Sequence, residues 1–367
     1  MKKYLSLIFA VLLAGCAARP TAAQKALTVT GSYPLHYAEQ FTVDECAGGY
    51  SLITIDGSRY LVVPAGAAVP DGLDADITVL CQPLEKVYLV STSAMDPIVR
   101  IGGLDAVALS GTQAENWYLP EAKAAMQTGQ IAYAGRYSAP DYETILAAGC
   151  DLALENTMIY HTPKVKEQLE SCGIPVLVER SSYESDPLAR MEWVKLYGIL
   201  FDRRQQAEEQ FDAAVQKVAP LKGQASTGKT AAFFSITSNH LATVRKGSDY
   251  VAKMIELAGG QYVFADLTDD GNHLATVNIS LEEFYAAAKD ADVLFYNSTI
   301  EGELHTLDEL IAKCPPLADC RAVQNGAVYC TAQSLFQQSM ELPDLILDMH
   351  KVFASESEDF TFLTKLS

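Results

Sequence analysis

Apolar residues recur every three to four positions through the stretch 186–220, DPLARMEWVKLYGILFDRRQQAEEQFDAAVQKVAP, apart from a polar gap at 202–206. This spacing predicts an α-helix, which Asp186 can cap and for which Pro187 suits the first turn. At 1.5 Å per residue, one continuous helix over 187–219 would span roughly 50 Å. We expect a single rigid helix that joins two lobes. The alternative is a long surface helix within one large domain.

The pattern differs on the two sides of this helix and within the first side. Residues 27–84 alternate apolar and polar positions around the turn signals Gly48-Gly49 and Asp56-Gly57, which predicts a small β-rich leader packed on the first lobe. Apolar strands then alternate with helices in 85–186 and again in 220–367. Such alternation indicates parallel sheets covered by helices. The predicted fold class is therefore α/β, with two parallel-sheet sandwich lobes joined by one long α-helix.

The amino terminus has the features of an export signal. Lys2 and Lys3 precede an apolar run that ends at Leu13-Ala14-Gly15-Cys16. The run is short for a transmembrane helix, so we interpret residues 1–16 as a signal peptide with a lipobox and 17–26 as a tether. Its resemblance to bacterial lipoprotein precursors implies that Cys16 becomes the first mature residue and carries a lipid.

Charge and cysteine content narrow the possibilities further. The formal net charge is −19, and no basic face that could bind phosphates is visible, so nucleic acid is excluded as a partner. Seven cysteines remain after Cys16, an odd number that cannot all pair internally. Either Cys150 with Cys172 or Cys314 with Cys320 could form a disulfide outside the cell, and buried free thiols are the alternative. No CxxC spacing supports a structural zinc site.

The two halves of the chain repeat one plan. Tyr142-Glu143 precedes an alanine pair, a strand and Asn156; Leu281-Glu282 precedes the same features and Asn297. Ligands of open parallel sheets bind outside the carboxyl ends of the strands. We therefore expect the ligand site to be a cleft between two similar lobes.

Four segments carry a family resemblance: SAPDYETILAAGCDLALENT (138–157), DYVAKMIELAGGQYVF (249–264), ISLEEFYAAAKDADVLFYNS (279–298) and AVQNGAVYC (322–330). Together with the connecting helix they resemble the solute-binding proteins of ABC importers for iron-siderophores, haem and cobalamin, over about 86–353. The resemblance implies two lobes that close only slightly over a ligand. The leader at 27–84 lies outside it.

The same resemblance implies a function. It indicates an extracytoplasmic, lipid-anchored monomer that binds an iron complex, siderophore or haem, and delivers it to an ABC permease and its ATPase. It implies no catalytic residues, no cofactor and no membrane contact beyond the lipid. It also places two exposed permease-docking glutamates at Glu143 and Glu282. The alternatives are a cobalamin or other corrinoid ligand, a bare metal ion, or an exported hydrolase.

Candidate ligand residues are the polar and aromatic side chains at predicted strand ends. Arginine beside aromatic rings suits an anionic or planar metal complex, because the guanidinium binds oxygen ligands while a ring covers the organic shell. A bare metal ion would need converging ligands, and His161, His240 and His273 show no supporting spacing. The candidates for the cleft are Trp117, Tyr118, Arg136, Tyr137, Asn156, Arg180, Tyr183, His240, Arg245 and Asn297.

One apparent nucleotide motif does not fit its context. GQASTGKT at 223–230 matches the phosphate-loop pattern GxxxxGK[ST]. A phosphate loop leaves a strand and opens a helix, whereas here a predicted helix precedes the motif and the predicted strand TAAFFSIT follows it. We interpret this segment as a linker into the second lobe.

Overall fold

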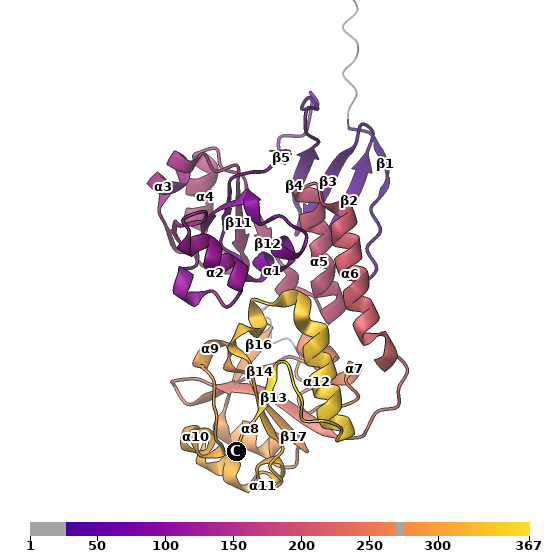
Figure 1. The fold of residues 1–367 in the computed structure, drawn as a ribbon, viewed down its shortest axis with the longest axis vertical. Helices are drawn as coiled ribbons and strands as arrows, with labels where there is room; N and C mark the ends of the chain where they lie inside the picture. The colour runs from indigo at the N-terminus through magenta and orange to yellow at the C-terminus, as the bar shows by residue number, and fades with distance from the viewer. Residues whose placement is uncertain (1–26, 269–274) are drawn as a thin grey trace, which may run out of the picture.

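The computed structural model describes residues 27–268 and 275–367. The predicted signal peptide, Cys16, the tether and His273 lie outside the described residues. Figure 1 shows a leader sheet and a first lobe above a second lobe, with helices along one side of the molecule. The mixed α/β fold confirms the predicted α/β class and its two lobes.

The leader is a five-stranded sheet that follows the chain in order. All its neighbouring strands are antiparallel except β4 and β5, which are parallel. Asp56 and Gly57, with φ of 48° and 79°, form the two-residue turn between β3 and β4, as their sequence predicts. The strands are β1 (Val29–Ser32), β2 (Phe41–Cys46), β3 (Tyr50–Ile55), β4 (Ser58–Val63) and β5 (Ile77–Cys81).

The first lobe contains a parallel sheet in the order β12-β11-β6-β7-β8. The strands are β6 (Val87–Leu89), β7 (Val107–Ser110), β8 (Ala132–Tyr133), β11 (Leu152–Asn156) and β12 (Val176–Glu179), and a short pair, β9 (Gly135–Arg136) and β10 (Ala139–Pro140), follows β8. The helices are α1 (Thr92–Arg100), α2 (Pro120–Gln127), α3 (Tyr142–Ala148) and α4 (Pro163–Ser171).

The second lobe has a parallel centre, β13-β17-β18, with β15 also parallel to β13. Strands β14, β16 and β19 extend it with antiparallel pairs, so this sheet is mixed rather than purely parallel. Strand β13 follows the phosphate-loop-like segment, as the linker interpretation requires. The strands are β13 (Thr230–Ile236), β14 (Leu241–Arg245), β15 (Gln261–Tyr262), β16 (Thr276–Ser280), β17 (Val293–Tyr296), β18 (Val328–Thr331) and β19 (Leu363–Lys365). The helices are α7 (Tyr250–Leu257), α8 (Leu281–Ala288), α9 (Ser298–Glu301), α10 (Leu307–Lys313), α11 (Arg321–Gln324) and α12 (Leu342–Ala354).

The connection between the lobes is a helical hairpin, which corrects the prediction of one continuous helix over 187–219. Helix α5 (Pro187–Leu200) ends at a short turn, and α6 (Arg204–Val218) returns beside it (Figure 1). Asp202 in the turn has a φ of 55°, a left-handed conformation that ends a helix. Across the hairpin, Lys195 Nζ lies 3.2 Å from Glu208 Oε2. The polar gap in the hydrophobic pattern therefore marks a reversal of the chain.

The hairpin depends on a small residue where its helices approach. A Cβ atom on Gly198 would lie 2.5 Å from Ala207 Cβ and 3.1 Å from the Arg203 carbonyl oxygen. We expect Gly198→Ala to lower the free energy of unfolding by about 1–3 kcal/mol, since overpacking outweighs the higher helix propensity of alanine. Chemical denaturation measures this change. Adding Ala207→Gly should restore part of the loss; an equal loss in the double variant would contradict the proposed contact.

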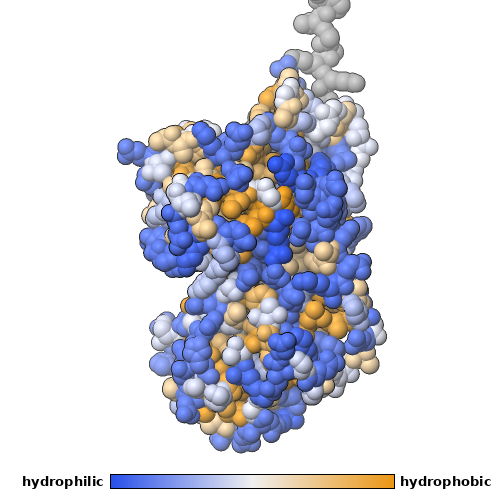
Figure 2. Space-filling view, in the orientation of Figure 1, coloured by the Kyte–Doolittle hydropathy of each residue, from blue (hydrophilic) through white to orange (hydrophobic). Residues whose placement is uncertain are grey.

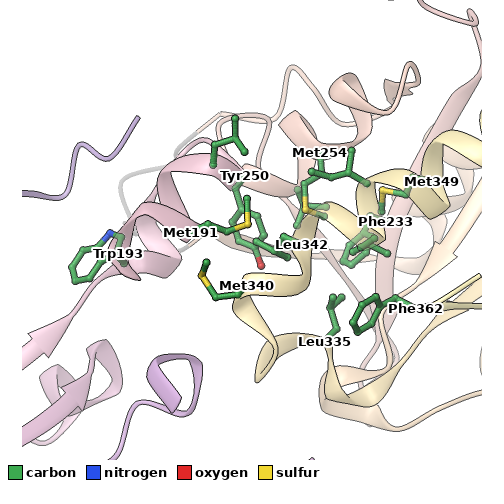
Figure 3. Packing of buried hydrophobic residues seen from close by; sticks show 14 of the residues in the cluster. Met191, Trp193, Phe233, Tyr250, Met254, Leu335, Met340, Leu342, Met349 and Phe362 are labelled. Atoms are coloured by element: carbon green, nitrogen blue, oxygen red, sulfur yellow. The ribbon is translucent and has the colours of Figure 1, made fainter. Parts of the chain in front are cut away.

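The hydrophobic core is continuous between the lobes. Figure 3 shows Met191 of α5 beside Tyr250, Met340 and Leu342 of the second lobe. All four side chains are buried, and the guanidinium carbon of Arg190 lies 4.7 Å from the Tyr250 ring centroid. Because protein interiors pack at the density of organic crystals, this junction resists large changes in the lobe orientation.

Two buried carboxylates fasten the leader to the first lobe and α5. Glu192 of α5 accepts hydrogen bonds from the backbone N–H groups of 36–38, at 2.7–3.0 Å. Glu184 accepts from the N–H groups of Glu39 and Gln40 at 3.0 and 3.1 Å. The leader is thus built into the fold.

The cysteines between residues 27 and 367 are all free thiols in this structure. Cys46, Cys314, Cys320 and Cys330 are buried, as the free-thiol alternative expects, whereas Cys150 and Cys172 are half-buried and Cys81 is exposed, which that alternative does not expect. Over the described ranges, no helix has the length and apolar character that crossing a membrane requires.

Glu155 on β11 is fully buried, and within the described part of the chain neither carboxylate oxygen has a hydrogen-bond partner. Burial raises its pKa from 4.5 to about 8. The unfolded chain therefore releases this proton first as the pH rises, so stability falls between about pH 4.5 and pH 8.

Glu155→Gln should remove that pH dependence, because an amide does not ionise in this range. We expect the variant to be more stable than the wild type by about 4 kcal/mol at pH 8, because each pKa unit corresponds to about 1.4 kcal/mol, and similar to it at pH 4.5. Thermal unfolding followed from pH 4.5 to 8 measures the difference. Parallel stability curves for the two proteins would show that Glu155 does not titrate in this way.

Candidate ligand cleft

A cleft of about 660 Å³ lies where the leader, the first lobe and the second lobe meet. The space-filling view shows a mostly hydrophilic surface with a notch between the lobes on one side (Figure 2). Polar side chains form much of the cleft wall, so it suits a ligand with hydrogen-bonding groups. Its lining residues are Gln40 and Asp56 of the leader, Tyr160, Arg180, Ser182, Tyr183 and Glu184 of the first lobe, and Lys246, Ser248, Asp249 and Ala275 of the second.

Arg180 and Tyr183 form one wall, directly after β12. The Arg180 guanidinium carbon lies 4.9 Å from the Tyr183 ring centroid, and its Nη1 donates to Asp56 Oδ2 at 2.7 Å. Arg180 Nε is buried and has no hydrogen-bond partner among the described residues. A cation held over a ring can bind carboxylate, phenolate or hydroxamate oxygens while the ring contacts apolar ligand atoms.

Buried acids hold this wall in place. Glu179, at the end of β12, accepts hydrogen bonds from Ser91 Oγ at 3.0 Å and from the Ser181 N–H at 2.7 Å. Glu184 accepts from Trp193 Nε1 at 2.8 Å, and burial raises the pKa of its carboxyl against the opposing effect of its hydrogen bonds. Because these carboxylates are bonded within the protein, they hold the wall in place, and other side chains remain to contact a ligand.

The opposite wall comes from the loop after β14. Asp249 caps α7 by accepting from the Val251 N–H at 2.9 Å, and Arg245 Nη1 lies 3.4 Å from its Oδ2. Burial raises the pKa of the Asp249 carboxyl, whereas Arg245 lowers it. Arg245 and Asn297 line a separate small pocket of about 30 Å³ with Tyr250.

Comparison with known proteins now gives the family. A model of the family described as periplasmic binding protein matches residues 87–335, about two thirds of the chain. The chain belongs to this family. The matched region includes the first-lobe sheet, the helical hairpin and the second-lobe sheet except β19, whereas the leader precedes it and α12 follows it.

Individual proteins are also similar to this chain. An uncharacterized lipoprotein of Methanocaldococcus jannaschii is 24% identical over 317 residues, which cover 83% of this chain and 74% of that protein. A periplasmic haem-binding protein from Pseudomonas aeruginosa aligns with a TM-score of 0.61 at 18% identity, over 77% of this chain and 98% of its own. An Fe3+-hydroxamate transport protein from Saccharomonospora viridis aligns with a TM-score of 0.58 at 23% identity, over 74% and 93%. At these identities the solved structures establish the shared fold.

The structure places four of the predicted ligand residues at these cavities. Arg180 and Tyr183 line the cleft of this periplasmic binding protein, and Arg245 and Asn297 line the separate small pocket. Asn297 also caps α9 by accepting from the Thr299 N–H at 3.2 Å.

The other candidates do not line these two cavities, and the structure corrects the expected placement of Trp117. Trp117 is 1% exposed and donates from Nε1 to Ser110 Oγ, so its ring belongs to the core. The Tyr118 N–H donates to Gln337 Oε1 across the lobe junction, at 2.8 Å. The remaining candidates line neither of these two cavities: Arg136 is exposed, Tyr137 packs against buried residues of the first lobe, Asn156 accepts from the Met158 N–H, and His240 is exposed in the β13–β14 turn.

Several lining residues were not predicted from the sequence. The sequence indicates only a turn at Asp56, and Asp249 begins a segment with a family resemblance that does not point to a ligand contact. Lys246 precedes that segment and carries no signal of its own. Tyr160 adjoins His161, but the pattern gave no reason to select it. In the described ranges, no group of three or more histidine, cysteine, aspartate or glutamate side chains could hold a metal ion.

The two predicted docking glutamates occupy equivalent places in the lobes. Glu143 lies in the first turn of α3 and Glu282 in the first turn of α8, and both are exposed. A helix amino terminus stabilises a carboxylate there. Both remain open to a cationic partner.

Proposed function

We propose that this periplasmic binding protein captures a bulky metal complex outside the cytoplasm, an iron-siderophore or haem, and delivers it to an ABC permease. It would be held to the membrane through lipid on Cys16, act as a monomer and perform no chemistry on its cargo. This proposal rests on the cleft between the two lobes, in a chain that belongs to a family of binding proteins. Similarity to an uncharacterized lipoprotein supports the lipid anchor. The volume of the cleft, about 660 Å³, lies within the range of small-molecule sites.

Direct titration tests the ligand class. The purified full-length protein, kept in detergent, is titrated with ferric siderophores, haem and cobalamin while tyrosine and tryptophan fluorescence is recorded. We expect saturable binding of an iron complex. Binding of cobalamin alone would favour the corrinoid alternative, and native mass spectrometry without any bound complex, together with failure of all titrations, would refute the proposal.

Arg180 should carry a large part of the affinity. We expect Arg180→Gln to weaken binding of the iron complex by roughly tenfold or more, because a charge-assisted hydrogen bond contributes about 1.5–3 kcal/mol. The matched control is Arg59→Gln, since Arg59 pairs with Asp74 and Asp76 on the leader and does not line the cleft. Equal effects of the two substitutions would place the ligand away from Arg180.

A further inference from the structure

The leader contributes directly to the cleft, although it lies outside the matched family region. Its β3–β4 turn brings Asp56 to Arg180, with Asp56 Oδ2 2.7 Å from Arg180 Nη1. The segment before β2 brings Gln40 to the same cavity. The Asp56 side chain is 55% exposed and that of Arg180 is 16% exposed. The acid is therefore the accessible member of the pair.

The ionisable side chains of the cleft do not make it a site for anions. Arg180 and Lys246 are basic, whereas Asp56, Glu184 and Asp249 are acidic. Glu184 is occupied by backbone N–H groups and Trp193, and Asp249 by Arg245 and the start of α7. Asp56 is thus the carboxylate that a ligand at Arg180 meets first.

We propose that the leader is a third wall of the ligand site and that Asp56 sets its charge selectivity. The inference rests on the proposed function. Asp56 partly neutralises Arg180 and repels further negative charge, so the site prefers a metal chelate without net negative charge to a polyanionic one. Such a chelate can accept hydrogen bonds from Arg180 and donate to Asp56, whereas a polyanion gains from the first contact and loses at the second.

The turn allows a clean substitution. Asp56 has a φ of 48° and precedes Gly57 in a two-residue hairpin turn. Asn-Gly is a preferred pair for such a turn, so Asp56→Asn removes the charge and retains the backbone conformation. The control is Asp74→Asn, which removes a charge from the same leader at a carboxylate that pairs with Arg59 and does not line the cleft.

The experiment titrates the full-length wild type and both variants with two probes, a ferric tris(hydroxamate) without net negative charge and a polyanionic ferric tris(catecholate). We expect Asp56→Asn to tighten catecholate binding roughly tenfold, to change hydroxamate binding by about twofold at most, and to lose most of its gain at about 0.5 M salt. Asp74→Asn should change neither.

Hydroxamate binding by the wild type, with equal catecholate affinities in Asp56→Asn and Asp74→Asn, would overturn the selectivity role and leave the proposed function intact. A similar gain for both probes in Asp56→Asn would also overturn it, because charge selectivity would then be absent. If no variant and no wild-type sample bound any metal chelate, the proposed function would fail and this inference with it.

Discussion

Replacing Glu192 with alanine is expected to lower the free energy of unfolding by about 3–5 kcal/mol. The Glu192 side chain is 0% exposed and accepts hydrogen bonds from the N–H groups of His36, Tyr37 and Ala38. It also lies 3.0 Å from Lys195 Nζ, whose side chain is 1% exposed. Alanine would leave three partly buried N–H donors without this acceptor and the buried ammonium group of Lys195 without its closest carboxylate. Urea denaturation followed by circular dichroism measures the loss.

Glu209→Ala is the matched control. Glu209 lies on α6 and accepts a hydrogen bond from Gln205 Nε2 at the exposed face of that helix, so its loss should change stability by about 0.5 kcal/mol at most. Glu192→Gln should fall between the two variants, because an amide oxygen still accepts from the backbone but does not balance Lys195. A Glu192→Ala midpoint within error of the control would contradict the role given to this carboxylate.

Reversing both glutamates that are predicted to dock on the permease, Glu143→Lys with Glu282→Lys, is expected to abolish uptake of the iron complex by cells. If these glutamates dock on a cationic surface of the permease, lysines would place like charges against that surface, and they would also oppose the helix dipoles. Ligand affinity of the purified double variant should equal that of the wild type, since neither residue lines the cleft. Uptake of radiolabelled iron complex and fluorescence titration measure the two quantities.

The single reversals and a remote control complete this test. Each single variant should retain partial uptake, because one lobe still docks. Glu209→Lys, on neither docking helix, should leave uptake unchanged. Loss of ligand affinity in the double variant, or normal uptake despite normal expression, would remove Glu143 and Glu282 from the docking surface.

Much of the architecture follows from the spacing of apolar residues. The two α/β lobes, the leader and the Asp56-Gly57 turn were predicted because each depends on local periodicity or turn chemistry. The helical hairpin was not. The gap at 202–206 was visible, but Asp202 adopts a left-handed conformation that only glycine signals reliably in a sequence, so the reversal could not be distinguished from a polar helix face.

The cleft was predictable only in part. A residue that follows a strand, such as Arg180, is placed near a sheet edge by topology alone. Trp117 shows the limit, since an aromatic residue after a strand can line a cavity or enter the core, and packing across the lobe decides between them. Asp56 reaches the cleft because the leader is held in place by hydrogen bonds from its backbone N–H groups at 36–40 to the buried Glu184 and Glu192. The pattern of side chains along the sequence does not encode such contacts.

The packed junction around Met191 and Met340 bears on how an importer would tell full receptors from empty ones. A binding protein whose two lobes share one hydrophobic core keeps nearly the same shape with and without its ligand. In the proposed transport cycle, the outer shape of the protein would then tell the permease little about whether a ligand is bound. The permease would have to detect the bound ligand directly, by contact at the opening of the cleft.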